Sequence, residues 1–266
     1  MMIKFARACA FALATSSLVA AWKDPVSLFP SVINEGRPKG EIKNVDGIDM
    51  YHAYPDRRSK TNSSTAILYL TDIFGIPLLQ NKLLADSFAR AGYLTIIPDL
   101  FAGDAIPSDL PEGTLNLTTW FPKHQPANVE PIIDRTIAYL RDDLGIQTIG
   151  AVGYCFGGRY VARFLAEGKG VDYGFAAHPS VLSNAEIGEI VNPISIAAGE
   201  LDATFNLTQQ FDADRLLSGN NVTYEQTLYS GAPHGFAVRV NISVPRQKYA
   251  KQSSYIQALK WFNFWF

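Results

Sequence analysis

Apolar segments of strand-like and helix-like pattern alternate along most of this 266-residue chain. The strand-like segments are nearly continuous apolar runs, such as Ala66 to Leu70, as expected for strands covered on both faces of a sheet. Segments with helical spacing separate them, for example residues 78–92, which end at Gly92. Strands joined by helices favour a mostly parallel sheet with right-handed crossovers. The sequence therefore predicts an α/β fold.

The predicted elements follow one another without a linker of domain-boundary composition. A hairpin is predicted around Asp46 and Gly47, and residues 102–127, rich in proline and glycine, are predicted to form a long irregular excursion before a helix over 127–145. Beyond it, strands are predicted at 148–154, 173–178, 193–199 and 222–229, and helices at 158–167, 184–191, 206–218 and 245–264. We expect a single domain over residues 22–266.

Composition excludes several classes of partner. The chain is 47% apolar with a formal net charge of −2, and it carries no basic run, heptad pattern or repeat. This balance gives no electrostatic basis for binding nucleic acid or an anionic membrane. A small-molecule partner is expected instead.

The first 21 residues have the layout of a secretory signal peptide. Lys4 and Arg7 precede an apolar stretch from Ala8 to Ala21, which ends in small residues. The stretch is short for a membrane span, so no membrane span is expected in the mature chain. A signal anchor or a mitochondrial presequence is the alternative. The prediction is a secreted protein or one of the secretory pathway.

Five N-x-Ser/Thr sequons support that prediction, since chance predicts roughly 1.5 in a chain of this composition. They lie at Asn62, Asn116, Asn206, Asn221 and Asn241. All fall in predicted loops or helix ends, where a glycan can attach. The sequence thus predicts a glycoprotein.

The chain contains two cysteines, Cys9 and Cys155, and Cys9 would leave with the signal peptide. The mature protein would then have one thiol and no internal disulfide. An odd cysteine in an oxidising compartment is buried and inert, paired to another chain, or reactive.

Cys155 lies in the pattern G-x-C-x-G, between a predicted strand and a predicted helix. This pattern is typical of a nucleophile elbow, in which a strained turn projects the nucleophile over the strand ends. The following helix would direct its N–H groups and dipole at the thiol and favour the thiolate. The N–H of Phe156 would be one donor of an oxyanion hole.

Two residues downstream complete a candidate triad. Asp202 and His234 each follow a predicted strand, at the sheet edge where open α/β sheets build their sites. Their order after Cys155 is the nucleophile–acid–histidine order of elbow hydrolases. His234 would take the thiol proton and return it, and Asp202 would hold the imidazole in its tautomer and orientation.

From about residue 36 to residue 261 the chain resembles the dienelactone hydrolase family, most closely its fungal members. The segments that carry the resemblance are LTDIFG, GYLTIIPDLFAGD, IGAVGYCFGG, FAAHPS, AAGELDATF and LYSGAPHGFAVR. The resemblance implies an α/β-hydrolase fold without a large cap and hydrolysis of a lactone or ester through a cysteinyl acyl-enzyme. It also implies that no metal or cofactor is needed. A monomer or a homodimer is expected.

The resemblance also assigns roles to individual residues. Cys155, Asp202 and His234 match the family's triad, the N–H of Ile73 would be the second oxyanion donor, and Asp72 stands where the family usually has the glutamate that tunes the cysteine. Candidate substrate contacts are Arg239, Tyr154, Trp120 and His178. Bacterial members bind a substrate carboxylate through two arginines, and at one of those positions this chain has Val238. A neutral or bulkier lactone or ester therefore fits as well as a dienelactone.

Two other functions remain open at this point. One is a catalytically silent binding protein that keeps the hydrolase scaffold, although such a protein need not retain all three triad residues. The other is a thiol redox protein, which the absence of a C-x-x-C motif or a resolving cysteine disfavours.

Overall fold

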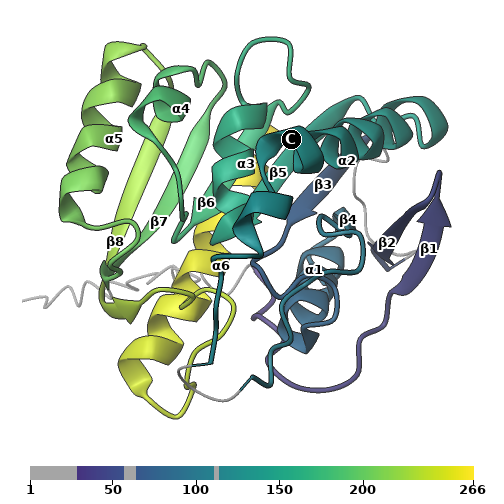
Figure 1. The fold of residues 1–266 in the computed structure, drawn as a ribbon, viewed down its shortest axis with the longest axis horizontal. Helices are drawn as coiled ribbons and strands as arrows, with labels where there is room; N and C mark the ends of the chain where they lie inside the picture. The colour runs from purple at the N-terminus through teal and green to yellow at the C-terminus, as the bar shows by residue number, and fades with distance from the viewer. Residues whose placement is uncertain (1–28, 57–63, 111–113) are drawn as a thin grey trace, which may run out of the picture.

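The structure is a computed structural model that describes residues 29–56, 64–110 and 114–266 (Figure 1). Its sheet has eight strands in the order β1-β2-β4-β3-β5-β6-β7-β8. The strands are β1 (Glu41–Val45), β2 (Ile48–Ala53), β3 (Thr65–Leu70), β4 (Leu94–Pro98), β5 (Thr148–Tyr154), β6 (Tyr173–Ala177), β7 (Ile194–Leu201) and β8 (Tyr224–Pro233). The helices are α1 (Leu79–Arg90), α2 (Pro126–Ala138), α3 (Phe156–Phe164), α4 (Asn184–Gly188), α5 (Leu207–Gly219) and α6 (Pro245–Trp265), with a 3-10 turn η2 (Phe121–Lys123) and a π turn η3 (Tyr139–Asp143).

The hairpin predicted at the start of the sheet is present. β1 and β2 pair antiparallel, and β2 pairs antiparallel with β4. Asp46 and Gly47 form the turn with φ values of 49° and 81°, as a tight two-residue hairpin turn requires. From β4 through β8 the neighbouring strands are all parallel.

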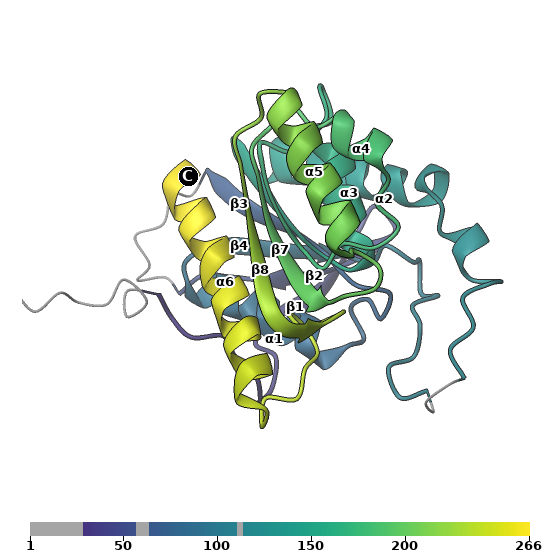
Figure 2. The same ribbon diagram turned by 90° about the vertical axis from the view of Figure 1, so that its left-hand side faces the viewer.

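Helices cover both faces of this sheet, which buries its central strands completely. Figure 2 shows α1 and α6 on one face and α2, α3, α4 and α5 on the other. All six residues of β3 are buried, which explains why its sequence is apolar without alternation. The predicted α/β-hydrolase class, with a mostly parallel sheet between helical layers, is confirmed.

The predicted alternation of strands and helices matches the structure, and the differences lie at element ends. α3 begins at Phe156, directly after the cysteine, rather than at residue 158. β8 continues to Pro233 instead of ending at residue 229, because an irregularity in its pairing with β7 lets Leu201 pair with Pro233. As a result, α3 begins directly after Cys155 and β8 ends directly before His234, two of the predicted catalytic residues.

The strand-to-helix turn at Cys155 requires glycine next to it. A Cβ at Gly157 would lie 2.1 Å from the carbonyl oxygen of Leu70, and one at Gly153 would lie 2.5 Å from the carbonyl oxygen of Gly157. These contacts are with backbone atoms, which cannot move aside as a side chain can. The start of α3 therefore packs directly on the end of β3, and the Gly157 N–H donates to the Thr71 carbonyl at 3.0 Å.

We predict that Gly157→Ala lowers the free energy of unfolding by about 3 kcal/mol, because the added methyl group overlaps the backbone of β3. Urea denaturation measures the change. Gly219→Ala is the matched control, since an added Cβ there has no neighbour within 4 Å, and it should change the free energy by less than about 1 kcal/mol. Equal stability of the two variants would contradict the close approach of β3 and α3.

Candidate active site

Parallel strand ends bring the three predicted triad residues together. Cys155 directly follows β5, Asp202 follows β7 and His234 follows β8. Leu201 and Pro233 form the last pair between β7 and β8, so the residues after them leave the sheet side by side. The geometry of the sheet thus places Asp202 next to His234, although 32 positions separate them in the sequence.

Cys155 itself adopts a strained backbone conformation. Its φ of 52° and ψ of −112° lie outside the regions that residues with a Cβ normally occupy. Such strain costs roughly 1–3 kcal/mol and persists only where surrounding structure imposes it. Here the Cys155 N–H donates to the Ala177 carbonyl, and the Cys155 carbonyl accepts from the N–H groups of Gly158 and Ser180. The side chain is thereby directed over the strand ends at the N-terminus of α3.

The three side chains form a continuous chain of contacts. His234 Nε2 lies 3.0 Å from Cys155 Sγ, and His234 Nδ1 lies 2.9 Å from Asp202 Oδ2. The other oxygen of Asp202 accepts hydrogen bonds from the backbone N–H groups of Thr204 and Phe205 and from the Thr204 hydroxyl. This arrangement orients the carboxylate toward the imidazole.

Electrostatics in this chain favour a protonated imidazole. Burial alone would lower the pKa of His234, but the hydrogen bonds and charges of Asp202 and Cys155 raise the pKa to about 10. Burial likewise opposes ionisation of Asp202, yet the hydrogen bond and charge of His234 lower the pKa of Asp202 to about 2. At neutral pH the pair is therefore an imidazolium beside a carboxylate.

The backbone N–H groups of Phe156 and Ile73, the predicted oxyanion donors, have no acceptor among the described residues. Phe156 is the first residue of α3, and Ile73 lies in the segment after β3 that Gly157 contacts. Neither N–H donates a hydrogen bond to another residue in the described part of the chain. Both are available for a developing negative charge on a substrate oxygen.

With this geometry established, similarity to known proteins can be stated. The family model of the dienelactone hydrolase family matches residues 48–266. The chain belongs to the dienelactone hydrolase family. It is a hydrolase of the type that acts on lactones or esters.

Two fungal relatives of this dienelactone hydrolase family member align over most of both chains. Hydrolase pyvD of Aspergillus violaceofuscus is 39% identical over 231 residues, covering 87% of this chain and 92% of that protein. Hydrolase tropI of Talaromyces stipitatus is 37% identical over 238 residues, covering 86% and 92%. A solved structure, a dienelactone hydrolase-like promiscuous phosphotriesterase from metagenomic libraries, shares the fold with a TM-score of 0.68 at 14% identity, covering 86% of this chain and 99% of that one.

Asp72, predicted to tune the cysteine, lies in a buried network of its own. Its carboxylate accepts hydrogen bonds from Asn81 Nδ2 and the Phe74 N–H on one oxygen and from Arg239 Nε at 3.3 Å on the other. Burial raises the pKa of Asp72, while the hydrogen bond of Asn81 and the charge of Arg239 oppose the shift. Its hydrogen bonds within the described residues do not include Cys155, so an influence on the thiol would act through space.

His178 packs against His234 of the predicted triad. Its ring centroid is 5.1 Å from that of His234 in an edge-to-face arrangement, and both of its ring nitrogens are buried without a hydrogen-bond partner among the described residues. Burial and the charge of His234 hold the pKa of His178 well below its ordinary value. His178 is therefore a neutral ring packed against the protonated one.

Of the other predicted substrate contacts, two side chains are buried in the protein and one binds Asp72. Tyr154 is 1% exposed and packs on Tyr69 and His178. Trp120 is buried, donates from Nε1 to the Asp104 carbonyl, and packs against Phe156. Arg239 is half-exposed, bonds to Asp72, and covers the Phe74 ring at 4.2 Å. Their contact with substrate stays a prediction.

Sequence reasoning missed two polar residues at the triad. The hydroxyl of Thr204 lies 2.8 Å from His234 Nδ1, and the hydroxyl of Ser180 lies 3.5 Å from Cys155 Sγ. The Asp-x-Thr spacing from Asp202 to Thr204 is a local turn signature and could have indicated the bond of Thr204 to Asp202, which brings the hydroxyl beside His234. For Ser180 no local signature exists, because the contact joins residues 25 positions apart.

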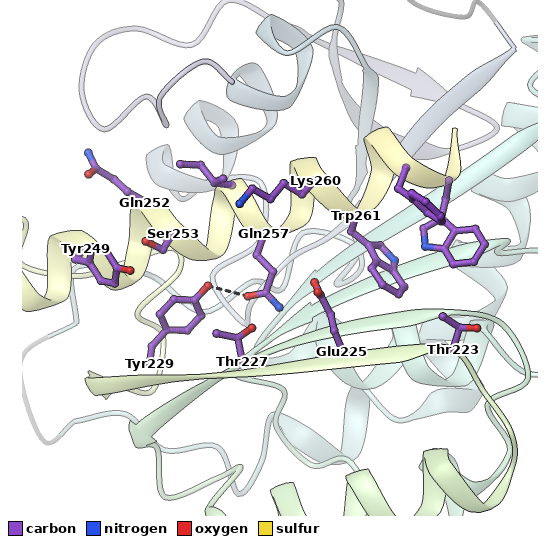
Figure 3. Close-up of a pocket in the computed structure, with 13 residues that line it drawn as sticks. Thr223, Glu225, Thr227, Tyr229, Tyr249, Gln252, Ser253, Gln257, Lys260 and Trp261 are labelled. Atoms are coloured by element: carbon purple, nitrogen blue, oxygen red, sulfur yellow. Dashed lines mark hydrogen bonds between the residues drawn. The ribbon is translucent and has the colours of Figure 1, made fainter. Parts of the chain in front are cut away.

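A large groove lies away from the triad. Its volume is about 670 Å³, and Figure 3 shows it between β8 and α6, beside the hydrogen bond of Tyr229 to Gln257. None of Cys155, Asp202 and His234 lines this groove. The triad, and not the size of a cavity, locates the candidate active site.

The remaining predictions concern regions outside the site. Asn116, Asn206, Asn221 and Asn241 are exposed, whereas Asn62 and residues 1–21 lie outside the described residues. Among the described residues, no helix is long and apolar enough to cross a membrane, and no group of three or more His, Cys, Asp or Glu side chains is arranged to hold a metal ion.

We predict a pH-dependent contribution of His234 to stability. Its folded pKa of about 10 lies above its ordinary value of 6.5, so the stabilisation is complete below about pH 6.5 and is lost as pH rises through about 10. The difference in free energy of unfolding between wild type and His234→Gln should therefore shrink by about 1 kcal/mol or more from pH 6 to pH 10. Urea denaturation at each pH measures it. A difference that is constant across this range would contradict a charged imidazole in the folded protein.

Proposed function

We propose that this protein hydrolyses a lactone or carboxylic ester through a Cys155–His234–Asp202 triad and a cysteinyl acyl-enzyme. The observation that carries the proposal is the chain of contacts from Sγ through the imidazole to the carboxylate, at 3.0 and 2.9 Å. Side chains from three different strand ends meet there in the arrangement that nucleophilic catalysis requires.

The first half-reaction forms the acyl-enzyme. With the thiol proton held by His234, the Cys155 thiolate attacks the carbonyl carbon, and the oxyanion is stabilised by the N–H groups of Phe156 and Ile73. The carbon–oxygen bond then breaks, and the His234 imidazolium gives its proton to the departing oxygen. In a lactone the alcohol or enol so released stays attached to the acyl group.

The second half-reaction returns the enzyme to its starting state. Neutral His234 removes a proton from a water molecule, and the resulting hydroxide attacks the thioester carbonyl. The sulfur leaves as a thiolate, the acid is released, and His234 again carries the proton. Asp202 stabilises the imidazolium in both halves and fixes Nδ1 as the proton-bearing nitrogen toward the carboxylate.

We predict that Cys155→Ala lowers kcat/KM on an aryl ester at least about 1,000-fold, and that His234→Gln and Asp202→Asn lower it by about 100-fold or more. Stopped-flow assays with p-nitrophenyl acetate and an aryl lactone measure these rates. Asp212→Asn, on the outer helix α5, is the control and should change kcat/KM less than about twofold.

Covalent trapping distinguishes this mechanism from a general-base hydrolase. Quenching wild type during turnover should give a protein heavier by one acyl group, located on Cys155 by peptide mass spectrometry. A Cys155→Ala variant with wild-type turnover, or a wild-type protein without turnover on any ester or lactone of a graded series, would refute the proposal.

We further propose that the protein enters the secretory pathway and carries N-linked glycan. Four of its sequon asparagines are exposed, and Asn206 caps α5 through its side-chain oxygen, which leaves its amide nitrogen free for a glycan. Expression in a eukaryotic host should give a secreted protein whose mass falls on treatment with an endoglycosidase. Retention in the cytosol with no mass change would contradict this prediction.

A further inference from the structure

A cavity whose lining does not include the triad contains a largely buried lysine without a partner among the described residues. The cavity has a volume of about 470 Å³, within the range of small-molecule sites. It is lined by Asn34, Glu35, Leu78, Gln80, Ser108, Val238, Arg239, Val240, Ile242 and Lys251. Cys155, Asp202 and His234 are not among these residues, so the cavity is distinct from the triad.

Lys251 is the residue that indicates a ligand in this cavity. Its side chain comes from α6 and the residue is only 5% exposed. Within the described residues its ammonium makes no hydrogen bond or ion pair. An ammonium that is largely removed from water and has no anionic partner is costly, and Lys251 lines the cavity.

The rest of the lining points to an organic acid. Arg239 contributes a second positive charge, and its Nε is already committed to Asp72. Glu35, the acidic residue of the lining, is exposed and forms no ion pair with Lys251. Asn34 Oδ1 is buried without a hydrogen-bond partner among the described residues and can accept from a hydroxyl group.

The walls between these polar groups are apolar. Leu78 and Val238 are buried and Val240 and Ile242 are half-buried. An inorganic anion would leave these side chains uncovered, whereas the hydrocarbon body of an aryl or alkyl carboxylate would cover them. We propose that this cavity binds a small organic carboxylate, with its charge on Lys251 and Arg239 and its hydrocarbon part against Leu78 and Val238.

The ionisation of the lysine gives the site a pH dependence. Burial lowers the pKa of Lys251 to about 8, so the amine is charged at pH 7 and mostly neutral at pH 9.5. The other charged groups that line the cavity are Glu35 and Arg239, and Asp72 contacts Arg239. Carboxylate affinity should therefore fall as pH rises through about 8.

Calorimetric titration with phenylacetate tests the proposal. At pH 7 we expect saturable binding to wild type, an affinity at least about tenfold lower in Lys251→Met, and one within about twofold of wild type in Lys248→Met, an exposed lysine of the same helix. Phenylacetamide and inorganic phosphate should each bind at least about tenfold more weakly than phenylacetate. Wild type should lose about tenfold in affinity between pH 7 and pH 9.5.

Alkylation of Cys155 with iodoacetamide separates this site from the active site. The alkylated protein should bind phenylacetate as the untreated protein does, because Cys155 does not line the cavity. Loss of binding on alkylation would place the acid at the triad and overturn the proposal. So would the absence of saturable binding, equal affinity in Lys251→Met, or, if that variant does not fold, an affinity in wild type that is unchanged at pH 9.5. None of these readouts requires turnover, so they stand apart from the test of the proposed hydrolysis.

Discussion

The arrangement of the whole site depends on how closely the start of α3 packs against the end of β3. Gly153 and Gly157 leave no room for a side chain between them and their neighbours, and the Gly157 N–H closes the contact on Thr71. Cys155, which lies between these two glycines, adopts a φ of 52°. The segment after β3, with its free Ile73 N–H, is fixed to the elbow by the same hydrogen bond. One close approach thus holds Cys155 and the segment that contains Ile73 together.

The charges of the site lie next to that strand-to-helix turn. The imidazolium of His234 lies between a sulfur and a carboxylate, and it rests on the neutral ring of His178. A second protonated histidine at that position would repel the first, and burial of His178 prevents it. His178 is therefore neutral because it is buried without a partner, and His234 is protonated because Asp202 and Cys155 raise its pKa.

Much of the fold could be predicted from sequence because both faces of the central strands are covered. Their continuous apolar runs, and the glycines that end helices, mark the elements within a few residues. The triad residues could be located because each directly follows a strand. Thr204, Ser180 and the network around Asp72 could not be found in full, since those contacts depend on side-chain direction across strands far apart in sequence. The cavity at Lys251 could not be predicted either, because five separate segments of the chain form it.

The described part of the irregular excursion after β4 contacts the segment after β3 and the start of α3. The Ile106 N–H donates a hydrogen bond to the Ile73 carbonyl, and the Trp120 ring packs on the Phe156 ring. The reacting groups, in contrast, sit on strand ends that the sheet holds in register. Substitutions in the excursion can therefore alter the packing around Phe156 while the strand register that holds Cys155, Asp202 and His234 is retained. The irregular segment and the strand ends are thus separate parts of the fold, so the sequence of the segment can diverge while the geometry of the three side chains stays the same.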